Sequence, residues 1–318
     1  MIKTPKFWDH TYGLSQALRP LSWIYTRIAA WRESRVTPVK VSIPVICVGN
    51  LVMGGAGKTP TVMAIVEILK ELGHTPHILC RGYGAYIKGT INVDPKVHGY
   101  LQVGDEPLML AEIAPTWVSA DRIESAKAAI QQGASILVMD DGLQNASIHK
   151  DFSFIVIDVL QGFGNSFVFP AGPLREPIHT GLKRGQAIIL IGDPHLAKQT
   201  IKGHFGAKIV HVGPIPTHPV VAFAGIGYPL KFRHTLHEHQ YTIREFVTFA
   251  DHYPYTIMDM RRLRRIANNY KADLITTKKD HLRLPSGFRD RVLVLPIRLK
   301  FDNPGAIKKL LHEKFPIT

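Results

Sequence analysis

The segment Gly54-Gly55-Ala56-Gly57 is followed directly by Lys58 and Thr59, and the apolar run 44–48 lies shortly before it. A strand that enters such a turn and continues into a helix is typical of a phosphate-binding loop. In these loops backbone N–H groups surround phosphate oxygens, the lysine reaches the β- and γ-phosphates, and the threonine hydroxyl binds Mg²⁺. The pattern G-x-x-x-x-G-K-[ST] begins with glycine, where this chain has Val52. A glycine-rich turn without a ligand is the alternative. The residues expected to bind nucleotide are Val52, Met53, Gly54, Gly55, Ala56, Gly57, Lys58 and Thr59.

Two adjacent acids, Asp140 and Asp141, end the apolar run 136–139 and precede a glycine. A carboxylate at the carboxyl end of a strand beside the phosphate loop can bind Mg²⁺ directly or through water. We therefore expect a metal site that includes Thr59, Asp140 and Asp141. A plain Asp-Asp-Gly turn is the alternative interpretation.

Two further residues could take part in proton transfer. Asp105 lies in an acidic turn before the expected helix 108–113, where it could accept the proton of an attacking hydroxyl group. Capping of that helix is the competing interpretation, and the local sequence favours it. His252, in a polar and aromatic segment, is the best candidate among the sixteen histidines, although a lone histidine is more often structural. The candidate catalytic residues are Lys58, Asp105 and His252.

A competing function is indicated by Thr277-Lys278-Lys279-Asp280, which fits the [N/T]-K-x-D pattern that GTPases use for guanine. The Asp-x-x-G sequence of GTPases is missing, because Leu143 stands three positions after Asp140. A regulatory P-loop GTPase or ATPase is therefore the second hypothesis.

The chain is strongly basic, with 39 Lys and Arg against 25 Asp and Glu and a net charge of +14. Nucleic acid, an anionic membrane surface and a phosphorylated substrate are all candidate partners for such a charge. The arginine cluster 261–265 could contact phosphates, but it has no interleaved aromatic residues, so a solvated helix face is favoured and nucleic acid is not expected. The two cysteines, Cys47 and Cys80, lack metal-site spacing and are expected to be buried thiols in a reducing compartment.

The first forty residues differ from the rest of the chain. Apolar residues recur there at roughly helical spacing, arginines interrupt them, and three of the four tryptophans occur here. A basic amphipathic helix rich in Trp and Tyr suits a membrane interface, whereas packing on its own domain is an equally good explanation. The segment has no uncharged apolar run of about 18 residues, so a membrane span is not expected, and no cleavable signal is evident.

These candidate residues need a scaffold, and strand and helix patterns alternate regularly after the phosphate loop. The expected strands are 75–80, 116–119, 136–139, 154–159, 187–191 and 208–212. This alternation predicts an α/β fold with a parallel sheet covered by helices on both faces. Beyond the proline-rich segment 213–219 we expect strands 220–224, 272–276 and 292–300 and helices 257–270 and 304–315.

The expected domains are an amphipathic N-terminal segment (1–40), a phosphate-loop domain (41–214) and a smaller α/β domain (215–318). No internal repeat is visible, and no obligate protein partner is evident.

Taken together, these motifs resemble the lipid A 4′-kinase family, also called the tetraacyldisaccharide 4′-kinases. The similarity runs from about Lys6-Phe7-Trp8 to the C-terminal strand, in the order of the family. The family's acidic motif often reads Asp-Asp-Gly-Phe-Gln-His, whereas this chain has Leu143 and Asn145 at the fourth and sixth places. The segments that carry the resemblance are 49–60, Arg81-Gly-Tyr-Gly84, Gly104-Asp-Glu-Pro107, Asp140-Asp-Gly-Leu-Gln144, Pro170-Ala-Gly-Pro-Leu-Arg-Glu176, Asp251-His252 and Thr276-Thr-Lys-Lys-Asp280.

The resemblance implies an enzyme that uses ATP and Mg²⁺. It would transfer the γ-phosphoryl group to the 4′-hydroxyl of a tetra-acylated glucosamine disaccharide 1-phosphate, giving lipid IVA in lipid A biosynthesis. It also implies peripheral attachment to the anionic cytoplasmic face of the inner membrane.

By the same resemblance each candidate residue has an implied role. Lys58 would hold the phosphates, Thr59 and Asp140 or Asp141 the metal, and Asp105 would be the general base with His252 of the second domain as its partner. The residues with weaker implied contacts in the same cleft are Arg81, Glu106, Arg122 and Glu176.

Overall fold

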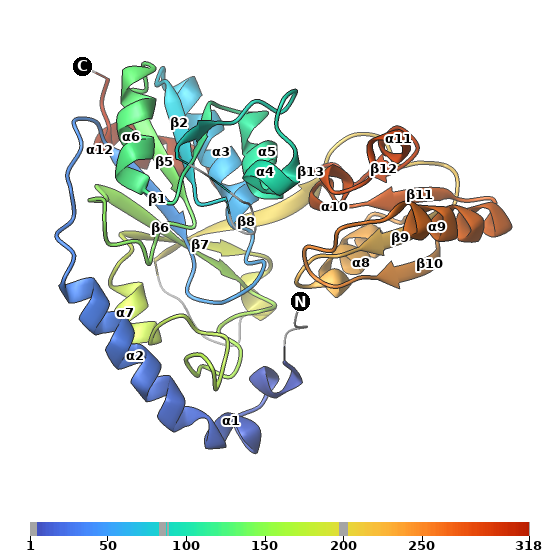
Figure 1. Cartoon of the computed structure of the whole chain (residues 1–318), viewed down its shortest axis with the longest axis horizontal. Coiled ribbons are helices and arrows are strands. Elements are labelled where there is room, and N and C mark those ends of the chain that lie inside the picture. The colour runs from blue at the N-terminus through green and yellow to red at the C-terminus, as the bar shows by residue number, and fades with distance from the viewer. Residues whose placement is uncertain (1–4, 83–86, 88, 197–202, 318) are drawn as a thin grey trace. The chain divides into compact units, whose positions relative to one another are not determined.

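The computed structural model describes residues 5–82, 87, 89–196 and 203–317 (Figure 1). These residues form two compact units. Among the described residues, the larger unit comprises Lys6–Ile209 and 299–317, and the smaller comprises Pro5 and Val210–Arg298. Tyr83 and Gly84, from the motif at Arg81, lie outside the described residues.

Within the described residues, nine strands form one sheet of order β13-β8-β7-β6-β1-β5-β2-β4-β3. The neighbours from β8 to β4 are parallel, and β3 runs antiparallel to β4. The predicted α/β fold with a parallel sheet is thereby confirmed. The strands are β1 (Val45–Gly49), β2 (Pro76–Cys80), β3 (Ile91–Asn92), β4 (Thr116–Val118), β5 (Ile136–Asp140), β6 (Phe152–Asp158), β7 (Ala187–Ile191), β8 (His204–His211) and β13 (Ile297–Phe301).

Strand β1 lies at the centre of this sheet, between β5 and β6. All five of its residues are buried, as its uninterrupted apolar sequence requires. Val48 is in register with Asp140 of β5 and Phe154 of β6. Because parallel strands end at the same edge of a sheet, the loop that follows β1 and the acids that follow β5 lie at one edge.

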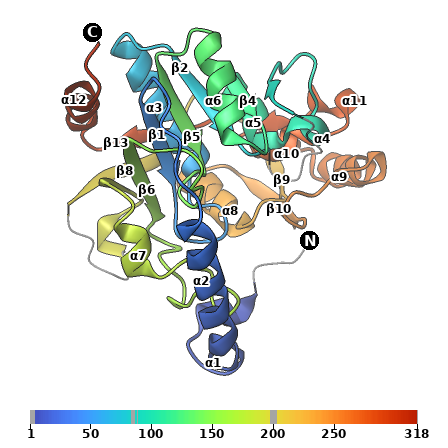
Figure 2. The same ribbon diagram turned by 60° about the vertical axis from the view of Figure 1, so that its left-hand side comes forward.

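Helices cover this sheet on both faces (Figure 2). Ala126 and Ala129 of α6 pack in one core cluster with Val45, Cys47 and Leu137 of the sheet. Helix α3 contacts β1, β2 and β5 and also meets α5 and α12. The helices of this unit include α3 (Lys58–Glu71), α4 (Tyr100–Val103), α5 (Asp105–Ala111), α6 (Arg122–Gln131), α7 (Ile178–Leu182), α12 (Pro304–Lys314) and the short 3₁₀ segments η1 (Lys6–Asp9) and η2 (Pro194–Leu196).

The structure places the C-terminal residues in a different unit from the one that the sequence pattern predicts. The described residues 299–317 belong to the larger unit, whereas the sequence pattern groups them with the domain 215–318. The ring of Phe315 packs edge-on against Phe152 at a centroid distance of 6.4 Å. The carbonyl of Phe315 also accepts a hydrogen bond from the His74 ring at 3.0 Å. Contacts between residues so far apart in sequence cannot be predicted from the local spacing of apolar residues.

The N-terminal segment is part of the larger unit and packs on it through polar and aromatic contacts. It contains α1 (Leu14–Ala17) and α2 (Arg19–Ser34), which lies beside α7 in both views (Figures 1 and 2). The indole N–H of Trp8 donates to the carbonyl of Pro170 at 3.1 Å, and the hydroxyl of Ser22 donates to the carbonyl of Val168 at 2.6 Å. Across the described residues, no helix has both the length and the hydrophobicity needed to cross a membrane.

In the smaller unit, four strands within the described residues form a parallel sheet of order β10-β9-β11-β12. Its helix α9 (Ile257–Tyr270) matches the expected helix 257–270. The pattern did not predict the half-buried edge strand β10, because its side chains show no clear hydrophobic alternation. The other elements are β9 (Val220–Ala224), β10 (Ile243–Thr248), β11 (Asp273–Thr276), β12 (Leu293–Val294), α8 (Pro229–Glu238), α10 (Lys278–Leu282) and α11 (Ser286–Arg289).

Candidate active site

The loop between β1 and α3 has the backbone geometry of a phosphate-binding turn. Gly54 and Gly57 have φ angles of 113° and 84°, a region that favours glycine. A Cβ atom at Gly57 would also lie 2.5 Å from Cδ1 of Ile191, so a side chain there would require that isoleucine to shift. Gly57 caps α3, and Lys58 and Thr59 are its first residues. The unpaired N–H groups of this helix end are therefore suited to bind an anion.

Val52, which departs from the usual pattern, is accommodated by a neighbouring segment. Its side chain is 4% exposed and belongs to the core cluster of this edge. Val52 forms an antiparallel bridge with Leu174, flanked by hydrogen bonds from Met53 N–H to Pro173 at 2.8 Å and from Arg175 N–H to Leu51 at 2.8 Å. The segment around Leu174 is thus paired with the phosphate loop, and a valine at position 52 strengthens that pairing.

Lys58 lies at the floor of the loop and is only 9% exposed. Its Nζ donates a hydrogen bond to Oδ1 of Asn50 at 3.1 Å and lies 3.6 Å from Oδ1 of Asp141. Burial lowers the pKa of Lys58 from its ordinary value, and the nearby Asp141 acts in the opposite direction. A lysine held in this way is oriented by two oxygen partners before any ligand binds.

Asp140 and Asp141 differ sharply in their surroundings. Asp140 is the last residue of β5 and is buried. Asp141 has a φ of 52°, and its carboxylate accepts two parallel hydrogen bonds from Arg175, at 2.8 and 2.9 Å. Burial opposes ionisation of Asp141, but the charges of Lys58 and Arg175 outweigh it and hold its pKa below the ordinary value. The carboxylate of Asp141 is therefore fixed between two cations.

Three residues of this site were not predicted as functional from the sequence: Arg175, Asn50 and Gln144. Gln144 donates to the carbonyl of Asn50 at 3.2 Å and to Glu176 at 3.0 Å, and it accepts from Arg175 at 3.0 Å. Arg175, Gln144 and Asn50 all lie within or beside the motifs 49–60, 140–144 and 170–176. Their position in these motifs was the signal that could have identified them from the sequence. Only the fold shows that the three motifs contact one another.

The hydrogen-bonded chain continues from Glu176 to the N-terminal helix. Arg184 donates to Glu176 at 2.6 Å and also forms a two-pronged ion pair with Glu33 near the end of α2. Glu176, a weaker candidate from the sequence, thus connects the loop region with α2. Two carboxylates around one guanidinium raise the pKa of Arg184, and Arg184 lowers the pKa of Glu33.

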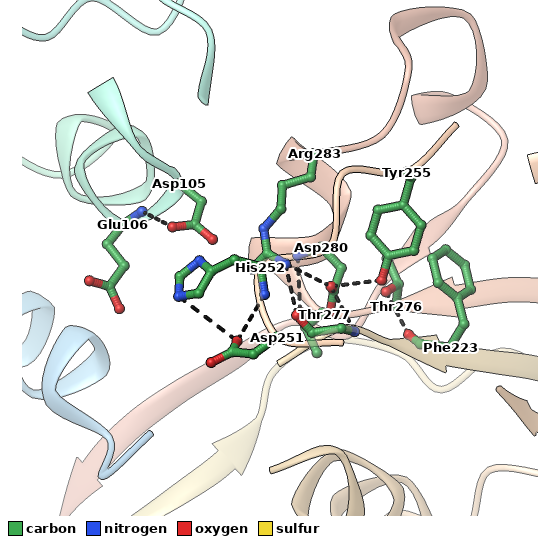
Figure 3. A network of polar contacts seen from close by, with 11 residues as sticks. Asp105, Glu106, Phe223, Asp251, His252, Tyr255, Thr276, Thr277, Asp280 and Arg283 are labelled. Atoms are coloured by element: carbon green, nitrogen blue, oxygen red, sulfur yellow. Dashed lines mark hydrogen bonds and ion pairs between the residues drawn. The ribbon is translucent and has the colours of Figure 1, made fainter. Parts of the chain in front are cut away.

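Asp105 and Glu106 begin helix α5, where Figure 3 shows them. The helix cap is Gly104, so the competing prediction that Asp105 caps this helix is wrong. Asp105 is buried at the first helical position, and its carboxylate accepts the Glu106 N–H at 2.9 Å. An acid there is favoured by the helix dipole.

The two arginine candidates have different positions in the larger unit. Arg122 is buried, and its guanidinium donates to the carbonyls of Cys80 and Ser119, which joins β2 to the end of β4. This geometry gives Arg122 a role in holding the sheet edge. Arg81 follows β2 and is exposed.

His252 lies in the smaller unit, in the turn after β10 (Figure 3). Its φ is 54°, and its N–H donates to the carbonyl of Gly225 at 3.0 Å. The imidazole Nε2 lies 3.8 Å from Oδ1 of Asp251, and the same oxygen accepts the His252 N–H at 3.0 Å. The Asp251 carboxylate therefore lies beside both the backbone N–H and the ring of His252.

The segment Thr277–Asp280, which suggested a guanine site, has a structural role instead. Asp280 is 0% exposed, and its carboxylate accepts from Tyr255, Thr277 and the N–H of Gly225 at 2.7–2.9 Å. Guanine recognition requires a carboxylate that the base can reach. The hypothesis of a regulatory GTPase therefore loses the observation that supported it.

The donor set around the phosphate loop suits Mg²⁺. Magnesium prefers carboxylate, hydroxyl and phosphate oxygens and keeps several of its waters. Thr59 and Asp140 supply such oxygens, whereas the carboxylate of Asp141, the third expected ligand, is bound by Arg175 and Lys58. Among the described residues, no group of three or more His, Cys, Asp or Glu side chains forms a complete metal cage. A site completed by phosphate oxygens and water is consistent with both observations.

Comparison with known proteins identifies the family. The family described as "Tetraacyldisaccharide-1-P 4'-kinase" matches residues 14–315. The tetraacyldisaccharide 4′-kinase of Gluconobacter oxydans is 42% identical over 98% of both chains. That of Phenylobacterium zucineum is 43% identical over 96% of this chain and 97% of its own. The crystal structure of LpxK from Aquifex aeolicus in complex with ATP has a TM-score of 0.77 and 27% identity, over 95% of this chain and 100% of that one. The chain belongs to the tetraacyldisaccharide 4′-kinase family.

Proposed function

We propose that this chain is a kinase that transfers the γ-phosphoryl group of ATP to the 4′-hydroxyl of a tetraacyldisaccharide 1-phosphate, forming lipid IVA. The observation that carries the proposal is the loop after β1, with Lys58 held between Asn50 and Asp141. Membership of the family supplies the acceptor, and the Aquifex relative was crystallised with ATP. The proposed cofactors are ATP and Mg²⁺.

The backbone of residues 52–59 would surround the phosphates, and Lys58 would neutralise their charge. Magnesium, when bound, would offset the negative charge on the phosphate oxygens. We assign Thr59 and Asp140 to the metal, because Asp141 is already bound by Arg175 and Lys58. Asp141 would then hold Lys58 in place. Phosphoryl transfer depends chiefly on such positioning and charge neutralisation.

Asp105 would act as the general base for the acceptor hydroxyl, with His252 of the smaller unit as its partner. A buried carboxylate at a helix start and a histidine beside an acid have the chemistry that this step requires. Replacement of Asp105 by Asn should depress kcat strongly while ATP still binds. Retention of nearly the full kcat would exclude Asp105 as the base.

The decisive experiment measures transfer of radiolabel from γ-labelled ATP to tetraacyldisaccharide 1-phosphate. Labelled lipid should form with the wild-type chain and fall to background with Lys58→Met. Nucleotide hydrolysis without labelled lipid, or a marked preference for GTP, would instead favour the regulatory NTPase. The double replacement Lys127→Gln and Glu124→Gln, which removes an exposed ion pair at 3.1 Å, is the matched surface control.

Attachment to an anionic membrane surface, at the cytoplasmic face of the inner membrane, is part of the same proposal. Trp23 and Trp31 on α2 are 63% and 54% exposed, an unusual state for tryptophan in a water-facing helix. Arg27 and Arg35 lie over their rings at 5.0 and 4.1 Å. Aromatic rings flanked by cations suit the headgroup region of a bilayer.

The membrane proposal is tested with sedimented vesicles of phosphatidylcholine, with and without phosphatidylglycerol. The double variant Trp23→Ser, Trp31→Ser should lose most of its binding to the anionic vesicles. Leu101→Ser, which alters an exposed apolar residue on α4, should bind like the wild type. Undiminished binding of the double variant would refute a membrane role for this helix face.

A further inference from the structure

We propose that Asp280 is a positioning residue for His252 and that it acts through the peptide group of Gly225. The inference rests on the proposed function, in which His252 takes part in catalysis. It assigns a role to the Thr277–Asp280 motif, which the phosphate-transfer site by itself does not use.

The first step of the argument is that one carboxylate organises several separate segments of the smaller unit. Oδ1 of Asp280 accepts the Gly225 N–H at 2.9 Å and the Tyr255 hydroxyl at 2.8 Å. Oδ2 accepts the Thr277 hydroxyl at 2.7 Å. Arg283 lies 3.3 Å from Oδ1, and both members of this ion pair are almost fully buried (Figure 3). A buried pair with this many hydrogen bonds has one well-defined geometry.

The second step concerns the opposite side of the same glycine. The carbonyl of Gly225 accepts a hydrogen bond from Arg283 at 2.8 Å and another from the His252 N–H at 3.0 Å. Asp280 and Arg283 therefore fix Gly225 from both its N–H and its C=O. Gly225 in turn holds the backbone of His252. Gly225 alone thus connects the buried Asp280–Arg283 pair with His252.

The third step is that glycine is required at this point. A Cβ atom on Gly225 would lie 2.8 Å from the carbonyl oxygen of Ala250 and 3.0 Å from the Tyr255 hydroxyl. The turn that carries His252 therefore packs directly on the Gly225 backbone, and any side chain would push it away.

The fourth step is that His252 needs external support. Its φ of 54° lies in the left-handed region, which is uncommon for a residue with a Cβ atom and costs energy unless the surroundings stabilise it. The hydrogen bond from its N–H to the Gly225 carbonyl ties this backbone to the neighbouring segment. If that support shifts, the turn moves and carries the imidazole with it.

The experiment is a double-mutant cycle on the full chain. Asp280→Asn should lower kcat for lipid phosphorylation by roughly 10- to 100-fold, because small displacements of a catalytic group have effects of this size. KM for ATP should stay within about twofold of the wild type, because the phosphate loop belongs to the larger unit. In a His252→Ala background, Asp280→Asn should change kcat by about twofold or less, because the two replacements remove the same contribution.

Two further variants keep the test decisive. Gly225→Ala retains both Asp280 and Arg283 and displaces the turn, so it should reproduce the kcat defect even if Asp280→Asn folds poorly. Leu236→Ala creates a cavity in a hydrophobic cluster of the smaller unit that contains Val220, Phe232 and Ile275. It should lower stability with little effect on kcat. These results separate positioning of His252 from general stability of the unit.

The outcomes also separate this inference from the proposed function. A wild-type chain that forms no labelled lipid, or a His252→Ala variant with full kcat, would overturn the proposed roles themselves. Effects of Asp280→Asn that multiply with those of His252→Ala would overturn only the positioning role. The same holds if Gly225→Ala keeps the wild-type kcat.

Discussion

Arg175 is predicted to contribute strongly to catalysis, although its own charge does not have to touch the substrate. Its guanidinium forms two parallel bonds with Asp141, at 2.8 and 2.9 Å, and a third with Gln144 at 3.0 Å. Asp141 lies next to Asp140 in the chain and contacts Lys58 at 3.6 Å. Loss of Arg175 would allow the Asp141 carboxylate to rotate and displace the lysine from the phosphate loop.

The size of the effect follows from the number of bonds lost. A hydrogen bond between charged groups contributes about 1.5–3 kcal/mol, and partial exposure of this pair reduces that to about 1–2 kcal/mol per bond. Arg175→Ala removes both bonds to Asp141, which corresponds to about 2–4 kcal/mol and a fall in kcat of roughly 30- to 900-fold. Arg175→Lys keeps the charge and one bond, so a fall of roughly 5- to 30-fold is expected.

The assay is steady-state lipid phosphorylation, with thermal unfolding measured in parallel. The kcat of Arg175→Lys should lie between those of the wild type and Arg175→Ala, because lysine retains the charge but cannot form two parallel hydrogen bonds with Asp141. The double replacement of Lys127 and Glu124 by Gln should change neither kcat nor the melting temperature by much, since exposed ion pairs contribute little. If Arg175→Ala kept kcat within about twofold of the wild type, the proposed coupling of Asp141 to Lys58 would be wrong.

Three other predictions follow from burial and charge. Cys47 and Cys80 should not react with a thiol reagent until the protein unfolds, because burial raises both thiol pKa values, that of Cys47 to about 12; rapid labelling of the native chain would contradict this. Val52→Gly should lower the free energy of unfolding by about 2–3 kcal/mol in urea titrations, because it removes a buried side chain, while ATP still binds. Arg184 lowers the pKa of Glu33 in the folded chain, so this ion pair stabilises the fold at a pH above the unfolded-state pKa of Glu33, and the stabilisation is lost as the pH falls through the folded-state pKa. Glu33→Gln should therefore reduce the loss of stability at acid pH. An unchanged dependence of stability on pH would argue against the pair.

Much of the candidate site could be predicted from the sequence because its chemistry depends on short contiguous segments. A phosphate loop is formed by consecutive residues, so Gly57, Lys58 and Thr59 reveal it without any knowledge of the fold. The same is true of a buried strand that ends in acids, as β5 does at Asp140. Regular alternation of strand and helix likewise predicted the parallel sheet, because both periodicities are local properties of the chain.

Other features depend on contacts between distant segments, and only the tertiary structure determined them. The roles of Arg175 and Asp280 follow from side chains that meet Asp141 and Gly225, which are far away in sequence. The pattern at Asp280 even indicated the wrong function, because local sequence does not show whether a carboxylate is exposed to a ligand or enclosed by its own fold. The sequence by itself therefore determined which chemical groups are present and which fold class carries them. Packing decided which of those groups face one another, because burial and long-range hydrogen bonds arise only when the chain is folded.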